Sequence, residues 1–190
     1  MKIILASKSP RRKELLEAAG AEIEIVPSDV EENINENDPA KLVEALSEIK
    51  ASSVFERVRN TIDADTLVLG ADTVVYAEGT ILGKPKDKDD AREMIKSLAG
   101  NVHSVFTGFT IISRKGKIYT DYSETKVYVY PMSDSEIEAY IESKEPYDKA
   151  GAYGIQGTFG KYVEKIEGDY NNVVGLPVSK IFQALKTIVN

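Results

Sequence analysis

Residues 2–13 read KIILASKSPRRK, and this stretch decides how the fold begins. Residues 2–6 are typical of a short buried strand, and Ser9-Pro10 supplies a helix-capping residue followed by a first-turn proline. A helical run at 11–19 then ends at Gly20. The stretch therefore predicts a strand, a turn and a helix in immediate succession.

The rest of the chain repeats these signals and predicts an α/β domain. Capping residues, glycines and prolines separate the alternating patterns from the helical ones. The expected elements are strands at 22–26, 66–75, 104–112, 117–130 and 162–166, and helices from Asp38-Pro39, at 87–98, at 135–143 and after Pro177, with turns at Glu78-Gly79 and Lys115-Gly116. The strands on either side of Lys115-Gly116 pair, so the sheet is partly antiparallel. A chain of 190 residues is expected to form one compact domain over residues 1–190.

The composition excludes several classes of protein. With 42% hydrophobic and 29% charged residues it is ordinary for a globular protein, and no stretch approaches the roughly 18 apolar residues of a membrane span. The apolar run near the start has only four residues, against about 7 to 15 in a signal-peptide core. We therefore expect a protein of the cytoplasm with no membrane partner.

The chain has no cysteine and one histidine, His103. Disulfides, thiolate catalysis and metal sites built from cysteines or several histidines are thereby excluded. A formal net charge of −7 argues against a protein that coats nucleic acid, so no nucleic-acid partner is expected. An acidic average is still compatible with a local cationic pocket for a small anion.

Three cations, Arg11, Arg12 and Lys13, occupy the first turn of the first predicted helix. A helix start carries a partial positive charge and favours acidic side chains by about 0.3 to 1 kcal/mol each, so this turn breaks a local rule. An anionic ligand such as phosphate would resolve the conflict. The alternative is that the three side chains extend into solvent or pair with the acidic residues around 29–32. A helix start is itself an anion site, which favours the first interpretation.

A lone carboxylate, Asp72, interrupts the apolar run at 67–75. A buried carboxylate is unfavourable unless it binds a metal, pairs with a cation or accepts several hydrogen bonds. A functional role and a purely structural one both stay open for it.

The next motif, at 82–86, places Lys84 and Lys86 beside a proline. These lysines suit a phosphate, but lysines in such a loop are more typically solvated.

Residues 145–157 combine ionisable, aromatic and amide groups with three glycines. Glycine allows the backbone to approach a ligand, and Gln156 can both donate to and accept from a base edge. The spacing matches neither a Walker A nor a dinucleotide fingerprint, and an irregular structural loop is the alternative. We interpret His103 and the tyrosines of the strand at 117–130 as structural residues.

Taken together, these motifs resemble the Maf family of nucleotide pyrophosphatases. The matching segments are LASKSPRR at 5–12, VEE at 30–32, GADTVV at 70–75, LGKP at 82–85, DKAGAYGIQG at 148–157 and GDYNNVVGLP at 168–177. Six short segments in family order over nearly the whole chain make coincidence a poor explanation. The resemblance implies an elongated mixed β-sheet flanked by helices, with two lobes around a cleft as in the related ITPase-like folds, and usually a homodimer.

The resemblance also implies an activity and a set of residue roles. The activity is hydrolysis of a nucleoside triphosphate to its monophosphate and diphosphate with a divalent metal cation, Mg²⁺ or Mn²⁺. On the family pattern, Asp72 is the proton acceptor that activates water, and Glu32 and Asp72 bind the metal. The triphosphate is bound by Ser7, Arg12, Lys50 and Lys84. Base preference is set by Arg11, Thr73 and Gln156, which match the branch that prefers dTTP and UTP, a house-cleaning activity with a possible link to septum formation.

Two rival functions accompany this interpretation. The first is a hydrolase for deaminated or modified purine triphosphates, which shares the phosphate chemistry and differs in base preference. The second is a noncatalytic nucleotide sensor that regulates cell division through a partner protein. Saturating binding without diphosphate release would distinguish the sensor from either enzyme.

Overall fold

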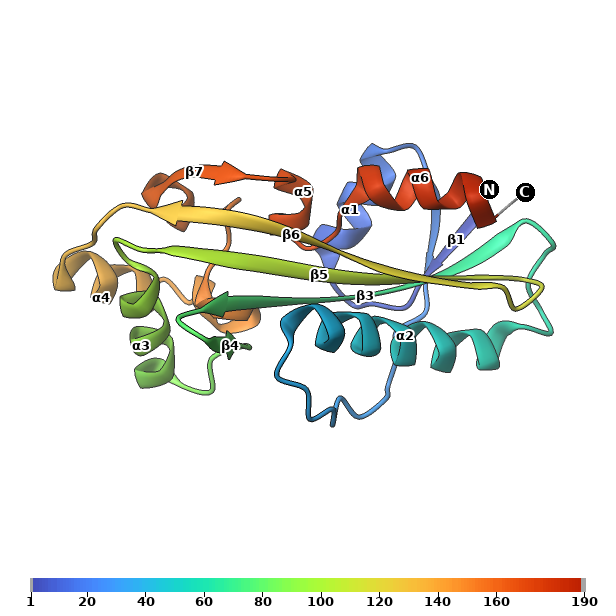
Figure 1. The fold of residues 1–190 in the computed structure, drawn as a ribbon, viewed down its shortest axis with the longest axis horizontal. Coiled ribbons are helices and arrows are strands. Elements are labelled where there is room, and N and C mark those ends of the chain that lie inside the picture. The colour runs from blue at the N-terminus through green and yellow to red at the C-terminus, as the bar shows by residue number, and fades with distance from the viewer. Residues whose placement is uncertain (1, 189–190) are drawn as a thin grey trace. The chain divides into compact units, whose positions relative to one another are not determined.

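A computed structural model of the protein describes residues 2–188, and in it one mixed sheet is flanked by helices (Figure 1). The sheet has seven strands within the described residues, in the order β2-β1-β3-β5-β6-β7, and β4 pairs with β3 outside this path. The strands are β1 Lys2–Leu5, β2 Glu22–Ile25, β3 Thr66–Ala77, β4 Thr80–Leu82, β5 Val102–Ser113, β6 Ile118–Val129 and β7 Val163–Glu167. β1 is parallel to β2 and β3, whereas β4 is antiparallel to β3 and β7 to β6. The predicted mixed α/β sheet is confirmed.

The helices lie where the sequence signals place them, within a few residues. They are α1 Pro10–Ala18, α2 Pro39–Val58, α3 Lys88–Leu98, α4 Asp134–Glu142, α5 Tyr170–Val174 and α6 Val178–Ile188, with 3-10 turns η1 Glu145–Asp148, η2 Ala150–Ala152 and η3 Thr158–Tyr162. The sequence did not predict α5 or the three 3-10 turns. These segments are too short to show a helical period, because each makes only one or two turns.

The helix starts differ in how their backbone N–H groups are satisfied. Asp38 caps α2 by accepting from the N–H of Ala40 at 2.9 Å, and Asp87 and Ser133 cap α3 and α4 in the same way. Ser9 holds the capping position of α1, with Pro10 first in the helix, but its side chain makes no capping hydrogen bond. Ser9 therefore occupies the predicted capping position of α1, but its side chain does not form the hydrogen bond of a cap.

The described residues group into two compact units. The first comprises residues 2–72, 107–123 and 175–188, and the second comprises 73–106 and 124–174, so β3, β5 and β6 contribute residues to both. The expectation of a single two-lobed domain over residues 1–190 stays a prediction. No helix among the described residues combines the length and apolar character needed to cross a bilayer.

The first unit packs helices on both faces of its part of the sheet (Figure 1). Helices α1 and α6 cover one face, where Leu16 and Ile181 are buried against Leu5 and Leu69. Helix α2 covers the other face, and glycines in β3 and β5 allow its backbone to come close. A Cβ atom at Gly70 would lie 2.3 Å from the carbonyl oxygen of Ser47, and one at Gly108 would lie 2.2 Å from that of Val43. Neither space admits a side chain, so the two glycines set the distance between α2 and the sheet.

The second unit has its own core. Helices α3 and α4 pack with the 3-10 turns against the sheet, and the buried side chains include Val75, Ile95, Val127, Ile137 and Phe159. A ring cluster around Phe159 joins η3 to α4, since its ring centroid lies 5.2 Å from that of Tyr140 and 4.7 Å from that of Tyr153. The middle of the glycine-rich segment at 145–157, at Ala152 and Tyr153, is therefore anchored in a packed core.

Candidate active site

Asp72 ends the first of the three chain segments that form the first unit, and its carboxylate pairs with a cation from α2. Lys50 Nζ lies 2.5 Å from Asp72 Oδ1 and 2.9 Å from Glu32 Oε1. The side chains of Lys50 and Asp72 are only 12% and 13% exposed, whereas that of Glu32 is 52% exposed. The sequence analysis left a metal, a cation or several hydrogen bonds as ways to stabilise this carboxylate, and the structure supplies a cation.

Local packing explains why Lys50 reaches Asp72. Gly70 lies two residues before Asp72 in β3, and a Cβ atom there would lie 2.3 Å from Ser47 O and 2.7 Å from Ala51 N. These two atoms flank Lys50 in α2. The close contact of α2 with Gly70 therefore holds the backbone of Lys50 close to β3, near Asp72.

Arg12 is held inside the first unit by main-chain carbonyl groups. Its Nε donates to Gly175 O at 2.9 Å, and its Nη1 donates to Ala71 O at 2.9 Å and to Ser7 Oγ at 3.1 Å. Burial lowers the pKa of Arg12, and the charges of Asp72 and Glu32 act against this effect. A guanidinium stays protonated in proteins, so Arg12 is a buried cation near both carboxylates.

The three cations of the first turn have separate environments. Arg12 is 9% exposed, whereas Lys13 pairs on the surface with Glu17 at 3.5 Å, and Arg11 is partly buried. The acidic residues around 29–32 pair with cations from other segments: Asp29 lies 3.8 Å from Lys8 and 3.2 Å from Arg57, and Glu32 lies 2.9 Å from Lys50. The three cations therefore lie in different environments, because successive residues of a helix point to different sides.

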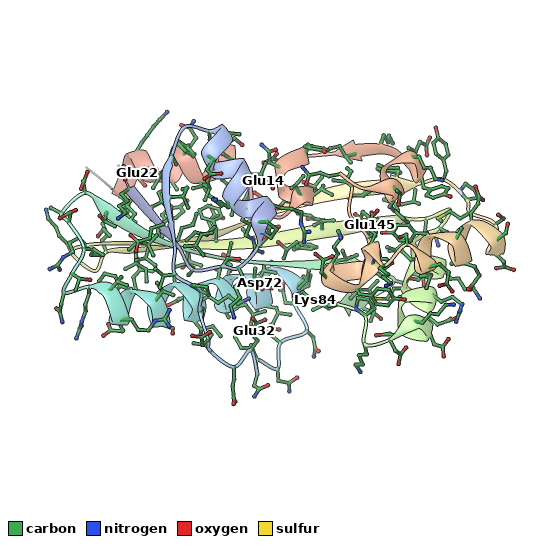
Figure 2. The ribbon with its side chains drawn as sticks, turned by 180° about the vertical axis from the view of Figure 1, so that it is seen from behind. Glu14, Glu22, Glu32, Asp72, Lys84 and Glu145 are labelled. Atoms are coloured by element: carbon green, nitrogen blue, oxygen red, sulfur yellow. The ribbon has the colours of Figure 1, made fainter. Side chains whose placement is uncertain are left out.

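We call Ser7, Arg12, Glu32, Lys50 and Asp72 the Asp72 cluster; Figure 2 labels its two carboxylates. Its two cations and two carboxylates balance one another. A bound triphosphate would add negative charge and thus favour a further cation. No group of three or more Asp, Glu, His or Cys residues suited to a metal exists in residues 2–188. Mg²⁺ commonly binds one or two carboxylates together with water and substrate phosphates, so Glu32 and Asp72, converging on one ammonium group, fit such an ion.

Three further predicted site residues, Thr73, Lys84 and Gln156, belong to the second unit. Thr73 follows Asp72 in β3 and is partly buried. Lys84 is exposed and precedes the buried Pro85, and the carbonyl oxygen of Gly83 accepts from the N–H of Gly151 at 2.9 Å. This hydrogen bond joins the Lys84 loop to the glycine-rich segment.

Gln156 lies on an exposed turn. The N–H of Gly157 donates to Gly154 O at 3.1 Å and closes residues 154–157, which we call the Gln156 turn. Upstream of it, Gly151 has φ 65°, and a Cβ atom there would lie 2.8 Å from Val75 Cγ2. Two features thus require glycine at 151: the positive φ, and the close packing of this segment on β3, which leaves no room for a side chain.

His103 is a structural residue, as the sequence suggested. Its side chain is buried, and its Nε2 lies 2.7 Å from the hydroxyl oxygen of Tyr153. Burial lowers the pKa of His103 to about 4, so the imidazole is neutral at neutral pH. It belongs to the core of the second unit.

Sequence reasoning missed Glu145. This carboxylate accepts hydrogen bonds from the N–H and the hydroxyl group of Thr158, at 2.9 and 2.8 Å, across 13 residues of chain. The available signal was its position, since Glu145 directly precedes Pro146 at the start of a glycine-rich segment. That position does not show that the hydrogen-bond partner is Thr158, 13 residues later. Figure 2 labels Glu145 and Lys84 in the second unit.

Comparisons with known proteins agree with the motif analysis. A dTTP/UTP pyrophosphatase of Thermoanaerobacter sp. (strain X514) is 52% identical over 187 residues, which cover 98% of this chain and 96% of the relative. A dTTP/UTP pyrophosphatase of Alkaliphilus metalliredigens (strain QYMF) is 50% identical, covering 97% and 94%.

Solved structures show a weaker likeness. The Ham1 protein of Staphylococcus aureus has a TM-score of 0.48 at 11% identity, covering 98% of this chain and 99% of its own. A nucleoside-triphosphatase described as a dITP/XTP pyrophosphatase from Mycobacterium abscessus has a TM-score of 0.45 at 12% identity, covering 98% and 94%. These likenesses are too low to bear on function. The sequence model of the Maf-like protein family, in contrast, matches residues 2–188, and with relatives at half identity over almost the full length this chain belongs to that family.

Proposed function

We propose that this protein is a nucleoside triphosphate pyrophosphatase that hydrolyses dTTP and UTP to the monophosphate and diphosphate. The observation that carries the proposal is the Asp72 cluster, in which a largely buried carboxylate is held beside Lys50 and near the buried Arg12. Relatives at 50 to 52% identity bear the name dTTP/UTP pyrophosphatase, which supports the choice of substrate.

The chemistry follows from the charges of the cluster. Asp72 accepts a proton from a water molecule, and the water oxygen bonds to the α-phosphorus. The bond from the α-phosphorus to the oxygen that bridges it to the β-phosphorus breaks, and diphosphate leaves with the electron pair. Lys50, whose Nζ lies 2.5 Å from Asp72 Oδ1 and 2.9 Å from Glu32 Oε1, holds the Asp72 carboxylate in place for proton transfer. Arg12 places a fixed positive charge near the phosphates, where it stabilises charge that develops in the transition state.

A divalent cation completes the proposed site. Glu32 and Asp72 would hold Mg²⁺ or Mn²⁺ together with phosphate oxygens, because these two carboxylates already converge on one cationic group. When bound, the ion would neutralise charge on the phosphate oxygens.

Base preference is proposed for different residues. Arg11, Thr73 and Gln156 occupy the positions that the family pattern associates with the base. Uracil and thymine present carbonyl acceptors at positions 2 and 4, and a donor-only group such as Arg11 would distinguish them from cytosine, which has an amino group at position 4. Lys84, which is exposed, is proposed to bind the triphosphate without contacting the base.

A diphosphate-release screen tests the proposal. Purified protein is assayed with dTTP, UTP, CTP, ATP and deaminated purine triphosphates, in Mg²⁺, in Mn²⁺ and in EDTA. We expect dTTP and UTP to be hydrolysed well ahead of CTP and ATP, with activity lost in EDTA. Preference for the deaminated purines would instead support the rival hydrolase, and saturable binding without release would support the sensor.

Two further expectations from the family resemblance are also proposals. A homodimer is to be tested by sedimentation equilibrium. A cytoplasmic location is the one in which nucleoside triphosphates are made and used, and cell fractionation tests it.

A further inference from the structure

Glu145 is a carboxylate for which the proposed mechanism has no use, yet its hydrogen bonds are unusually complete. Its Oε2 accepts from the N–H of Thr158 at 2.9 Å and from the Thr158 hydroxyl group at 2.8 Å, and its Oε1 accepts from the Tyr140 hydroxyl group at 3.3 Å. Burial opposes ionisation of this group, but the hydrogen bonds from Thr158, the charge of Lys149 and the backbone N–H of Phe159 prevail and lower the pKa of Glu145. The side chain is therefore an ionised acceptor for the backbone just after the Gln156 turn.

Gly157 is a glycine because of this carboxylate. Its φ of −96° and ψ of −160° are open to any residue, so backbone conformation does not require glycine there. A Cβ atom at this position would instead lie 1.9 Å from Glu145 Oε1 and 2.4 Å from Cδ. Glu145 thus fills the space above the residue that follows Gln156.

The other end of the Gln156 turn is also tied to Glu145. The main-chain carbonyl oxygen of Glu145 accepts from Lys149 Nζ at 2.7 Å. The aliphatic part of Lys149 then lies against Gly154, where a Cβ atom would be 2.7 Å from Lys149 Cε. Gly154 and Gly157 are the two residues whose hydrogen bond closes the turn. One residue therefore supports both ends of the turn, through its side chain at one end and through its backbone at the other.

We propose that Glu145 is a positioning residue for base selection, which fixes the Gln156 turn so that the Gln156 amide is presented in one orientation. This inference rests on the proposed function, because it assigns a positioning residue to the base-reading part of that site. An amide can donate or accept, so its selectivity depends on the orientation in which its turn holds it. Without Glu145, Gln156 would adapt to either pyrimidine pattern, and discrimination between uracil and cytosine would fall.

The test compares Glu145→Gln with a matched control. The substitution keeps the size of the side chain but replaces one acceptor oxygen by an NH₂ group among donors from Thr158 and Tyr140. Glu136→Gln in α4 is the control, because Glu136 likewise accepts from a backbone N–H and a hydroxyl group, both of Ser133 and both at 2.8 Å. Glu136 completes the capping box of α4 by accepting from the backbone of Ser133, and no hydrogen bond joins it to the Gln156 turn among the described residues. Its substitution therefore reports the effect of losing such a carboxylate elsewhere in the second unit.

The readout is the ratio of kcat/KM for UTP to that for CTP, measured in wild type, Glu145→Gln, Glu136→Gln, Gln156→Ala and the Glu145→Gln/Gln156→Ala double variant. We expect Glu145→Gln to lower the ratio about tenfold and Glu136→Gln to leave it unchanged. In the Gln156→Ala background, Glu145→Gln should change the ratio no further, because the two residues act as one unit. Gly157→Ala should reproduce the effect of Glu145→Gln, since both disturb the same contact.

A ratio unchanged in Glu145→Gln, or one that still falls in the Gln156→Ala background, would overturn the proposal. The wild-type measurement separates this outcome from failure of the proposed function, which would appear as no diphosphate release from any triphosphate. In that case the ratio of dissociation constants for UTP and CTP, measured in EDTA on the same five proteins, decides the role of Glu145.

Hydrogen exchange provides a test that needs no nucleotide. The backbone amides of Thr158 and Phe159 should exchange faster in Glu145→Gln than in wild type. Equal exchange rates would contradict the proposal that Glu145 anchors the turn.

Discussion

The Asp72 cluster and the Gln156 turn differ in how the protein holds them. In the first, the buried Arg12 is bonded to carbonyl groups of Ala71 and Gly175, and Lys50 is placed by the contact of α2 with Gly70. In the second, an exposed residue lies on a turn whose two ends both rest on Glu145. The core therefore fixes the charges that we assign to the chemical step, whereas a small set of polar contacts fixes the group that we assign to base reading. Substitutions in the cluster should lower kcat/KM to a similar extent for every base, and those near the turn should change the choice of base.

The largest effect is expected at Asp72. Asp72→Asn should keep the fold and lower kcat about 10² to 10⁴-fold, because an amide cannot accept the proton and is a poorer metal ligand. Steady-state diphosphate release from dTTP measures the loss, and thermal unfolding checks the fold. Near wild-type turnover in the folded variant would mean that Asp72 is structural and that water is activated elsewhere.

The next effect tests whether packing places Lys50. Gly70→Ala inserts a methyl group where only 2.3 Å is available to Ser47 O, so α2 must shift together with Lys50. We expect a loss of about 1 to 3 kcal/mol in the free energy of unfolding and a fall in kcat of about 10²-fold, the scale of a small misplacement of a catalytic group. Gly108→Ala is the control, since it pushes on α2 at Val43, about two turns before Lys50. Equal kcat values in the two variants would show that general destabilisation of the fold, and not displacement of Lys50, lowers activity.

A third prediction separates two cations that both serve the triphosphate. Arg12→Ala and Lys84→Ala should each raise KM to a similar extent for all triphosphates, because phosphate contacts do not read the base. Only Arg12→Ala should destabilise the fold, by about 2 kcal/mol or more, because it removes the buried hydrogen bonds that the guanidinium donates to the carbonyl groups of Ala71 and Gly175. The exposed Lys84 should change stability by less than about 0.5 kcal/mol. Urea unfolding and substrate titrations measure both quantities, and strongly base-dependent KM changes in both variants would contradict the division of roles.

The smallest effect concerns Arg11. Arg11→Ala should narrow the ratio of UTP to CTP hydrolysis, mainly by slowing UTP, because a donor facing the oxygen at position 4 is lost. A lost hydrogen bond to a base edge is worth about 1 to 3 kcal/mol, or about 5 to 150-fold in kcat/KM. Specificity constants for dTTP, UTP, CTP and ATP in both proteins test this expectation. Equal UTP and CTP constants in the wild type would refute the base-reading role and leave the pyrophosphatase assignment intact.

Local signals explain how much of this fold was predictable. Asp38-Pro39 and Asp87 mark helix starts by their own chemistry, and Glu78-Gly79 marks a hairpin turn, so these elements were predicted near their observed bounds. The short α5 and the 3-10 turns were not, because one or two turns carry no periodic pattern.

The site was predictable as a set of residues but not as a set of contacts. The three cations at 11–13 indicated an anion site without showing that Arg12 alone is buried. Its bond to Gly175 O spans 163 residues, and the pairing of Lys50 with Asp72 spans 22, so no local pattern contains them. Glu145 was missed for the same reason, since its role depends on Thr158 and Gly157 returning to it in the folded chain.

The most direct test of the central claim follows the oxygen of the attacking water. Wild-type protein is allowed to hydrolyse dTTP in water enriched in ¹⁸O, and the two products are separated and weighed by mass spectrometry. Water activated by Asp72 and bonded to the α-phosphorus places one ¹⁸O atom in the monophosphate and none in the diphosphate. Label in the diphosphate would mean attack on the β-phosphorus and would contradict the mechanism assigned to the Asp72 cluster.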